Sequence, residues 1–265
     1  MKVRKITVIA LIIALSILVG CTEKKYSENA VALVNGVIIK EQEIEKEITE
    51  RKMAIAIGEK IRLLEPNSLT LKEAIIQSLN ISEDELNPRQ IRYIESRERS
   101  TTKLLDNNEA FHILLREEVF YQEAVRQGHE VSVDKAKQIL EESNKVSNET
   151  LSGDEKALRK QNEIIKYITE IYKQYGFESE EDYLNQRIDK TAQAITISRM
   201  NNQFNRVIAD RLPQSDSYQK SIDISNAWDD YGEFLIDKAK VKVLNPEYSV
   251  ELYGKPWSYG LLDLE

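Results

Sequence analysis

The sequence predicts a mostly α-helical protein with a small β element of two or three strands. The composition favours helices, because 31% of the residues are charged and the 265 positions include only nine glycines and five prolines. Apolar residues recur at helical spacing through most of the chain, and several of these segments begin at a capping residue. Two short stretches instead carry the apolar pattern of β-strands.

The strand pattern is clearest at residues 30–40 (AVALVNGVIIK). There Asn35 and Gly36, a favoured pair for a tight turn, separate two runs of Val, Leu and Ile. Residues 238–244 (KAKVKVL) alternate between polar and apolar side chains, which predicts an edge strand.

The chain between these strands is expected to form a series of helices. The strongest helical pattern covers residues 106–127, and Gly128 follows where a helix-ending glycine belongs. Thr70 is predicted to cap one helix, and residues 82–85 form a capping box before another. Further helices are expected at 41–53, 132–143, 161–175 and 180–211, with surface loops at 144–158 and 213–221.

The first twenty residues have the pattern of a secretory signal peptide. A basic start, an apolar run over residues 6–19 and small residues just before Cys21 follow one another in the order of such signals. The run is shorter than the roughly 20 residues that a membrane-spanning helix needs. We therefore exclude residues 1–20 from the folded body.

The Leu-Val-Gly-Cys ending at residues 18–21 resembles the lipobox of bacterial lipoproteins. The resemblance implies a diacylglyceryl group on the Cys21 thiol, cleavage before it, and a protein held on the extracytoplasmic face of the cell membrane. Cys21 is the only cysteine, so it cannot form an internal disulfide, and a two-chain lipid suffices for stable anchoring. Residues 21–29 would be a lipidated polar tether. The alternative is an ordinary signal peptide followed by a chance cysteine.

The charge of the body argues against nucleic acid as a partner. Removing the three basic residues of the first twenty changes the net charge from −8 to −11. An acidic body is repelled by nucleic acid and by anionic lipid headgroups, and the sequence contains no basic patch.

The sequence also predicts no catalytic chemistry, cofactor or small-molecule substrate. Two histidines and one lipid-bearing cysteine cannot build a typical zinc site, and no nucleophile elbow or phosphate loop occurs. The many carboxylates, such as the alternating acidic residues over 41–47 and the run at 180–182, are interpreted as solvated helix faces and first turns. An enzyme would need an active-site cleft, and no pattern in the sequence predicts one.

Three stretches, in this order, are similar to SurA-type periplasmic chaperones and to the matching part of PrsA-type lipoprotein foldases. They are residues 31–39 (VALVNGVII), residues 114–134 (LLREEVFYQEAVRQGHEVSVD) and residues 175–183 (YGFESEEDY). The resemblance covers residues 30–245 and implies that the first and last strands pair, while the helices form an extended chaperone-like arm that cradles unfolded polypeptide. Residues 53–105 do not match and are interpreted as a helical insertion. Because the motifs are patterns rather than chemistry, another helical exported protein could also show them.

Foldases of this group usually carry a parvulin prolyl isomerase domain, and we predict that this chain lacks it. His112 lies within the strongest helical pattern, and no glycine-rich stretch comes after it. His112 is expected on the helix surface or in packing, and His129 near the carbonyls of a helix C-terminus.

The sequence thus favours an ATP-independent holding chaperone that binds unfolded or secreted polypeptides without nucleotide or metal. The alternative is a structural or adaptor lipoprotein dedicated to one envelope or developmental complex. The candidate client contacts are aromatic: Tyr172, Tyr175, Tyr253, Trp257 and Tyr259. The last three lie in the aromatic C-terminal tail, residues 246–265, where they could instead pin the tail to the body, and the first two could simply pack.

Overall fold

The structure is a computed structural model that describes residues 29–64, 69–151, 155–212 and 217–252. Within these ranges the protein is mostly helical, with one three-stranded antiparallel sheet that pairs the N-terminal strands with a C-terminal strand, as predicted. The elements in chain order are β1 (Ala30–Val34), β2 (Val37–Lys40), α2 (Glu41–Leu64), α3 (Leu71–Leu79), a 3₁₀ turn (Glu83–Glu85), α4 (Pro88–Thr102), α5 (Asn107–Arg126), α6 (Val133–Leu151), α7 (Glu155–Gln174), α8 (Glu180–Gln186), α9 (Ile188–Arg211), α10 (Ser217–Lys238) and β3 (Val241–Val243). None of the helices described is long and apolar enough to cross a membrane.

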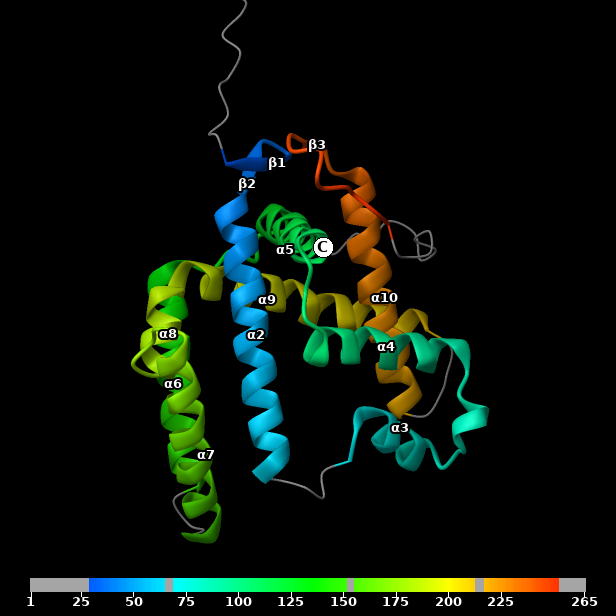
Figure 1. Ribbon diagram of the computed structural model, residues 1–265. Helices are drawn as coiled ribbons and strands as arrows, with labels where there is room; N and C mark the ends of the chain where they lie inside the picture. The colour runs from blue at the N-terminus through cyan, green and yellow to red at the C-terminus, as the bar shows by residue number, and fades with distance from the viewer. Residues whose placement is uncertain (1–28, 65–68, 152–154, 213–216, 253–265) are drawn as a thin grey trace, which may run out of the picture.

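The sheet joins the two ends of the described body (Figure 1). Its strand order is β2-β1-β3, so the first strand lies in the centre and the last strand forms one edge, as the alternation at 238–244 predicts. Asn35 and Gly36 form the turn with positive φ angles of 51° and 96°. The Asn35 side chain also accepts a hydrogen bond from the Lys240 backbone N–H (2.8 Å) and donates one to Gln122 of α5 (2.6 Å), which fixes the sheet to the helical body.

Several predicted caps are confirmed. Thr70 forms a capping box with Glu73 at the start of α3, and Ser82 forms one with Glu85 at the 3₁₀ turn. Gly128 follows α5 with a φ of +81°, the left-handed conformation that glycine adopts readily. These features could be predicted from the sequence because each depends only on residues within four positions of one another.

Four predictions about helix boundaries were wrong. The predicted loop at 144–158 is largely helical, because α6 continues to Leu151 and α7 begins at Glu155. The single helix expected over 180–211 is broken at Arg187, which ends α8 and precedes α9. Helix α10 starts at Ser217, inside the predicted loop at 213–221, and its course to Lys238 was not predicted. Helix α2 also runs well past residue 53, so the expected start of the insertion lies in the middle of a helix.

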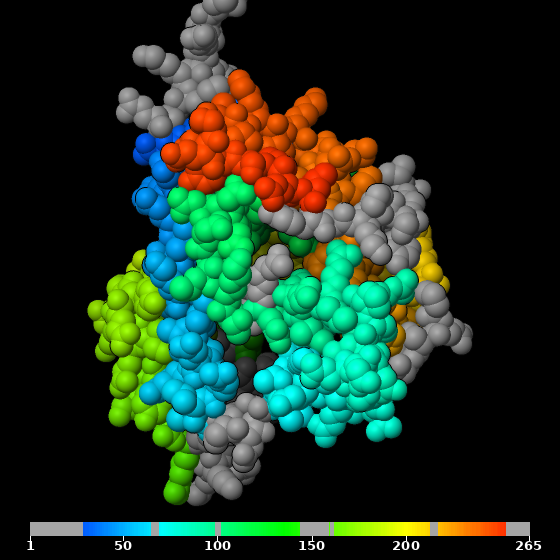
Figure 2. Space-filling model, turned by 45° about the vertical axis from the view of Figure 1, so that its right-hand side comes forward, coloured from blue at the N-terminus to red at the C-terminus, as the bar shows by residue number. Residues whose placement is uncertain are grey.

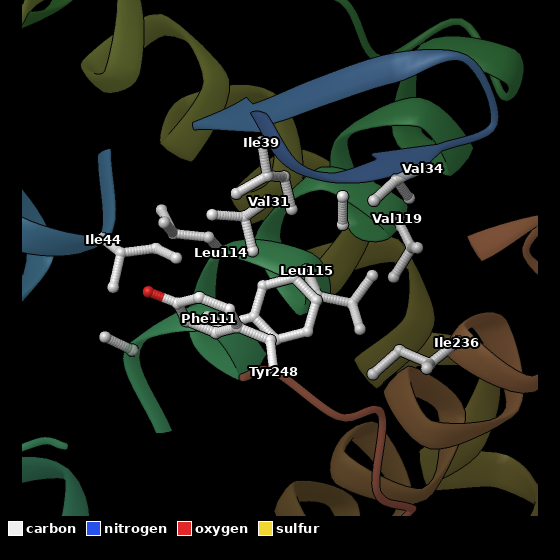
Figure 3. Packing of buried hydrophobic residues seen from close by; sticks show 12 residues of the cluster. Val31, Val34, Ile39, Ile44, Phe111, Leu114, Leu115, Val119, Ile236 and Tyr248 are labelled. Carbon is white, nitrogen blue, oxygen red and sulfur yellow. The ribbon is translucent and has the colours of Figure 1, made fainter. Parts of the chain in front are cut away.

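The main core lies between the sheet and the first half of α5. Phe111 and Leu115 of α5 are fully buried beneath Val31 and Val34 of the central strand, and Tyr248 packs edge-on against Phe111 with ring centroids 5.5 Å apart (Figure 3). A second cluster joins α5 to α9 and α10; its buried members are Phe120, Ala124, Met200, Phe204, Ile208, Leu212, Ala227 and Tyr231. Helix α5 therefore belongs to both clusters and is the centre of the fold.

Two groups of helices extend away from this centre (Figure 1). On one side the distal half of α2 packs against α7, with Met53 and Tyr172 buried between them, and α6 packs against α9. On the other side α3 and α4 pack against α10 around Ile75, Ile94 and Ile222. Figure 2 shows the surface hollowed between α2 and the α3–α4 segment.

Candidate functional site

The best candidate for a functional site is an open groove of about 640 Å³ where α2, α5, α8, α9 and α10 meet. It lies against the middle of α5, a helix that belongs to both core clusters. A rigid central helix flanked by a few polar side chains is a suitable wall for binding. We call this cavity the α5–α9 groove.

One wall of the α5–α9 groove is apolar and aromatic. Phe120 of α5 and Trp228 of α10 lie in parallel, with ring centroids 4.3 Å apart and planes 9° apart. Phe204 of α9 supports Trp228 from behind at 5.1 Å, edge to face. Phe120 is buried, whereas Trp228 and Ile197 are partly exposed to the groove. This wall offers an apolar surface whose rings are already held in place.

The rest of the groove lining is charged, but its charges are paired. Lys190 of α9 lies 3.3 Å from a carboxylate oxygen of Glu47 and 3.5 Å from one of Glu117. Arg187 forms an ion pair with Glu50 of α2. Because each of these cations has an acidic partner inside the groove, this part of the lining presents little unbalanced charge to a ligand.

Arg116, the third basic residue of the lining, is paired with a residue of α10. Its guanidinium donates a hydrogen bond to Asp229 of α10 (2.6 Å) and lies over the Phe120 ring, 5.3 Å from the ring centroid. The lining residues therefore carry three acidic and three basic side chains in all: Glu47, Glu50, Glu117, Arg116, Arg187 and Lys190. A groove with balanced charge and an aromatic wall suits an uncharged, apolar ligand segment.

The electrostatics of the groove result from its partial enclosure. Removal from bulk water raises the pKa of the Glu117 carboxyl; the nearby Lys190 opposes this shift and Glu47 adds to it. Burial lowers the pKa of the Arg187 guanidinium, which the carboxylate of Glu47 partly offsets. Half of the Glu117 side chain remains reachable by solvent (49% exposed), so this carboxyl stands at the groove mouth.

The groove lacks the parts of a common catalytic site. No histidine or cysteine is among its lining residues, so its Ser198 and Thr191 hydroxyls have no imidazole base in the lining. In the part of the chain that the structure describes, no group of three His, Cys, Asp or Glu side chains is placed to hold a metal ion. The arrangement can bind a ligand through shape and apolar contact.

Comparisons of the chain with protein-family models, with characterised proteins and with solved structures found no match. The similarity to SurA-type chaperones therefore stays a hypothesis. The groove and the contacts around it carry the functional argument.

Two of the five aromatic candidates are in the described part of the chain, and neither lines the groove. Tyr172 of α7 is buried (6% exposed) against Met53 and Ile171, and Tyr175 packs beside it. The Tyr172 ring contacts Tyr183, whose own side chain lines the groove, at a centroid distance of 5.4 Å. Burial, followed by the nearby Glu180 carboxylate, raises the pKa of the Tyr172 hydroxyl to about 12. Tyr172 thus packs behind a groove-lining ring.

The other candidate residues lie outside the described ranges. These are Cys21, the predicted lipid attachment site, and Tyr253, Trp257 and Tyr259 of the C-terminal tail. The last described part of the tail is nevertheless bound to the body. Tyr248 is buried in the main core, and the Glu251 backbone N–H donates a hydrogen bond to Nε2 of His112 (2.9 Å).

The two histidines take structural positions. His112 lies partly buried on α5 and accepts the bond from Glu251, in keeping with the predicted packing role. The backbone N–H of His129 donates to the Ala124 carbonyl (2.9 Å) just past the end of α5, so the residue lies at the predicted helix terminus.

Sequence reasoning missed most of the groove. Phe120, Arg187, Lys190 and Trp228 were not singled out, because each is ordinary within its own helix. Trp228 is one of only two tryptophans in the chain, and this rarity was the one available signal. It lies on α10, the helix that was not predicted, so its partners could not be anticipated.

Proposed function

We propose that this protein is a lipid-anchored, extracytoplasmic holding protein that binds extended or unfolded polypeptide segments in the α5–α9 groove without ATP, metal or catalysis. The observation that carries the proposal is the groove itself: it is open, has an aromatic wall, and neutralises its own charges. Polypeptide segments released from a folding chain expose apolar side chains of the kind that such a wall accepts.

The energetics suit weak and reversible holding. Each Å² of apolar surface that a client buries against Ile113, Ile197 and Trp228 contributes about 25 cal/mol before the costs of association are subtracted. A groove of about 640 Å³ takes up only a few side chains at a time. Affinity would therefore stay modest, and a held segment could leave to continue folding.

The charges outside the groove would influence which clients bind. The body without its first twenty residues has a net charge of −11, three units more negative than the whole chain at −8. Long-range attraction would favour clients with basic residues flanking an apolar segment, and it would be reduced by salt.

The proposed anchor would keep the groove close to the membrane. Residues 22–29 separate Cys21 from the start of β1, and eight extended residues reach at most about 29 Å. The sheet would then face the bilayer, and the groove would lie among the helices behind it.

A second function, a dedicated adaptor for one envelope complex, is favoured by the compactness of the groove. Tyr172 is buried, and the groove is smaller than a broad cradle for varied clients would be. An adaptor would bind one partner segment of matched shape and would ignore unrelated unfolded proteins.

The test uses the protein without residues 1–21, mixed with chemically unfolded clients and followed by light scattering. We expect suppression of aggregation at near-equal molar ratios without ATP. Ala194→Arg, which places a long charged side chain on an exposed position of the groove lining, should abolish it. Asn202→Arg is the matched control, since Asn202 is also exposed on α9 but does not line the groove.

Suppression that is equal in the two variants would show that the groove is not the binding site. No suppression by the unmodified body across several unrelated clients would rule out the holding function. The adaptor would then become the leading hypothesis.

A further inference from the structure

We propose that the C-terminal residues 253–265 of this same chain occupy the α5–α9 groove and compete with other polypeptides for it. This inference deepens the proposed function and rests on it, because it names the first occupant of the same binding site. Three properties support it: the position where the described chain ends, the length and composition of residues 253–265, and the chemistry of the groove wall.

The described chain ends beside the groove. Ser249 and Glu251 donate backbone hydrogen bonds to Asn108 and His112 of α5, each 2.9 Å long. In Figure 2 the red atoms of this C-terminal end lie directly against the green atoms of α5. Arg116, which lines the groove, is four residues along the same helix from His112, or about 6 Å.

The thirteen residues after Leu252 are long enough to enter the groove from this point. An extended chain of that length spans roughly 40 Å, several times the separation between His112 and Arg116. The hydrogen bonds at Ser249 and Glu251 keep the start of the segment close to the groove. Tethering of this kind gives an effective concentration on the order of millimolar, so even a weak contact would be populated.

The composition of the segment matches the groove wall. Its sequence is YGKPWSYGLLDLE, in which three aromatic residues and three leucines are accompanied by only three charged side chains. The groove offers the partly exposed side chains of Ile113, Ile197 and Trp228, the last held by its stack on buried Phe120, with its own charges already paired. Aromatic side chains prefer offset and edge-on contacts with such rings, which gives the apolar segment a specific place to bind.

The chain contains two tryptophans, one in the groove and one in the tail, and this allows a direct test. Trp257→Phe leaves Trp228 as the only reporter in an otherwise full-length tail. The experiment compares this variant with the chain ended after Leu252, both lacking residues 1–21. Every helix and strand that the structure describes lies between Ala30 and Val243, so both forms retain them.

If the tail occupies the groove, its removal will shift the emission of Trp228 to longer wavelength and increase quenching by acrylamide. A synthetic peptide of residues 253–265 with Phe at 257, added at roughly millimolar concentration, will reverse both changes. Ala194→Arg in the shortened chain will prevent the reversal, whereas Asn202→Arg will not.

A full-length second variant guards against misfolding of the shortened chain. Trp257→Ser combined with Leu261→Ser keeps the tail but removes two of its apolar side chains, and it should show the same changes at Trp228. Identical emission and quenching in all forms, or a peptide without effect, would overturn the inference.

Client binding separates this inference from the proposed function. If the shortened chain suppresses client aggregation more strongly than the full-length one, tail and client share the groove. If Trp228 responds to the tail while no form suppresses aggregation, the tail docks but the holding function is wrong.

Discussion

At the scale of single residues, His112 shows how one side chain can couple the C-terminal segment to pH. Its Nε2 atom accepts the Glu251 N–H, and only the neutral imidazole can do so. Burial lowers the pKa of His112 from its ordinary value of 6.5, although the carboxylates of Glu233 and Glu251 and the backbone of Ser249 act in the opposite direction.

We predict that acid weakens the protein through His112. Below pH 6.5 the unfolded chain binds a proton at this residue more readily than the folded protein does, so the free energy of unfolding falls as the pH drops toward the lowered folded pKa. The urea midpoint of the unmodified body should be lower at about pH 5 than at about pH 8. His112→Gln keeps a side-chain acceptor but does not titrate, so its urea midpoint should fall less between these two pH values.

His129→Gln is the control, because His129 is the only other histidine. The urea midpoint of His129→Gln should fall with pH as much as that of the unmodified body. If His112→Gln declined as steeply as the unmodified body, the contact with Glu251 would not be responsible.

Residue-scale features that depend on nearby sequence were predictable. Asn35 and Gly36 predict a turn independently of the rest of the fold, and Thr70 caps α3 through Glu73, only three residues away. The burial of Tyr172 was not decided by the sequence, since its neighbours Met53 and Tyr183 come from α2 and α8. A pattern within one helix gives its apolar face but not the element that covers that face.

At the scale of elements, the crossing of α5 and α10 determines the aromatic wall of the groove. Gly232 allows the close approach: a Cβ atom there would lie 2.9 Å from Cζ of Phe120 and 2.9 Å from Nε of Arg116. The composition of α10 also explains why this helix was not predicted from the sequence. Gly232 within it and its many Ser, Asp and Asn residues disfavour a helix locally, and tertiary contacts reverse that preference.

Gly232→Ala should therefore destabilise the protein despite the higher helix propensity of alanine. Displacing the Phe120 ring is overpacking, which costs about 1–3 kcal/mol, whereas the propensity gain is about 1 kcal/mol. The measurement is the urea midpoint together with the emission of Trp228, which stacks on Phe120.

Gly58→Ala provides the matched control on α2. A Cβ at Gly58 would meet nothing within 4 Å, so this variant should gain up to about 1 kcal/mol. Equal effects of the two substitutions would show that α10 can shift without cost and that the close approach is not needed.

At the scale of the whole molecule, the α3–α4 segment is held differently from the centre of the fold. Between α4 and α10, Arg89 lies 3.3 Å from Asp223 and Arg92 lies 2.7 Å from Asp230. The apolar contact beneath them has only three buried members. Helix α5, by contrast, is enclosed by the two large clusters. The sequence predicted α3 through its Thr70 cap, whereas the predicted box at 82–85 caps the 3₁₀ turn and α4 begins after Asn87. The attachment of the segment depends on arginine–aspartate pairs more than 130 positions apart.

Salt should therefore loosen one part of the molecule selectively. At about 1 M salt the screening length is roughly 3 Å, so the partly exposed pairs between α4 and α10 lose most of their attraction. We expect faster amide hydrogen exchange in α4 at high salt and unchanged exchange in α5. Asp230→Asn should reproduce the effect in α4 at low salt, whereas Asp237→Asn, whose pair with Lys238 is largely exposed, should not. Equal acceleration in α4 and α5 would mean that the protein opens as one unit, and that the α3–α4 segment is not separately attached.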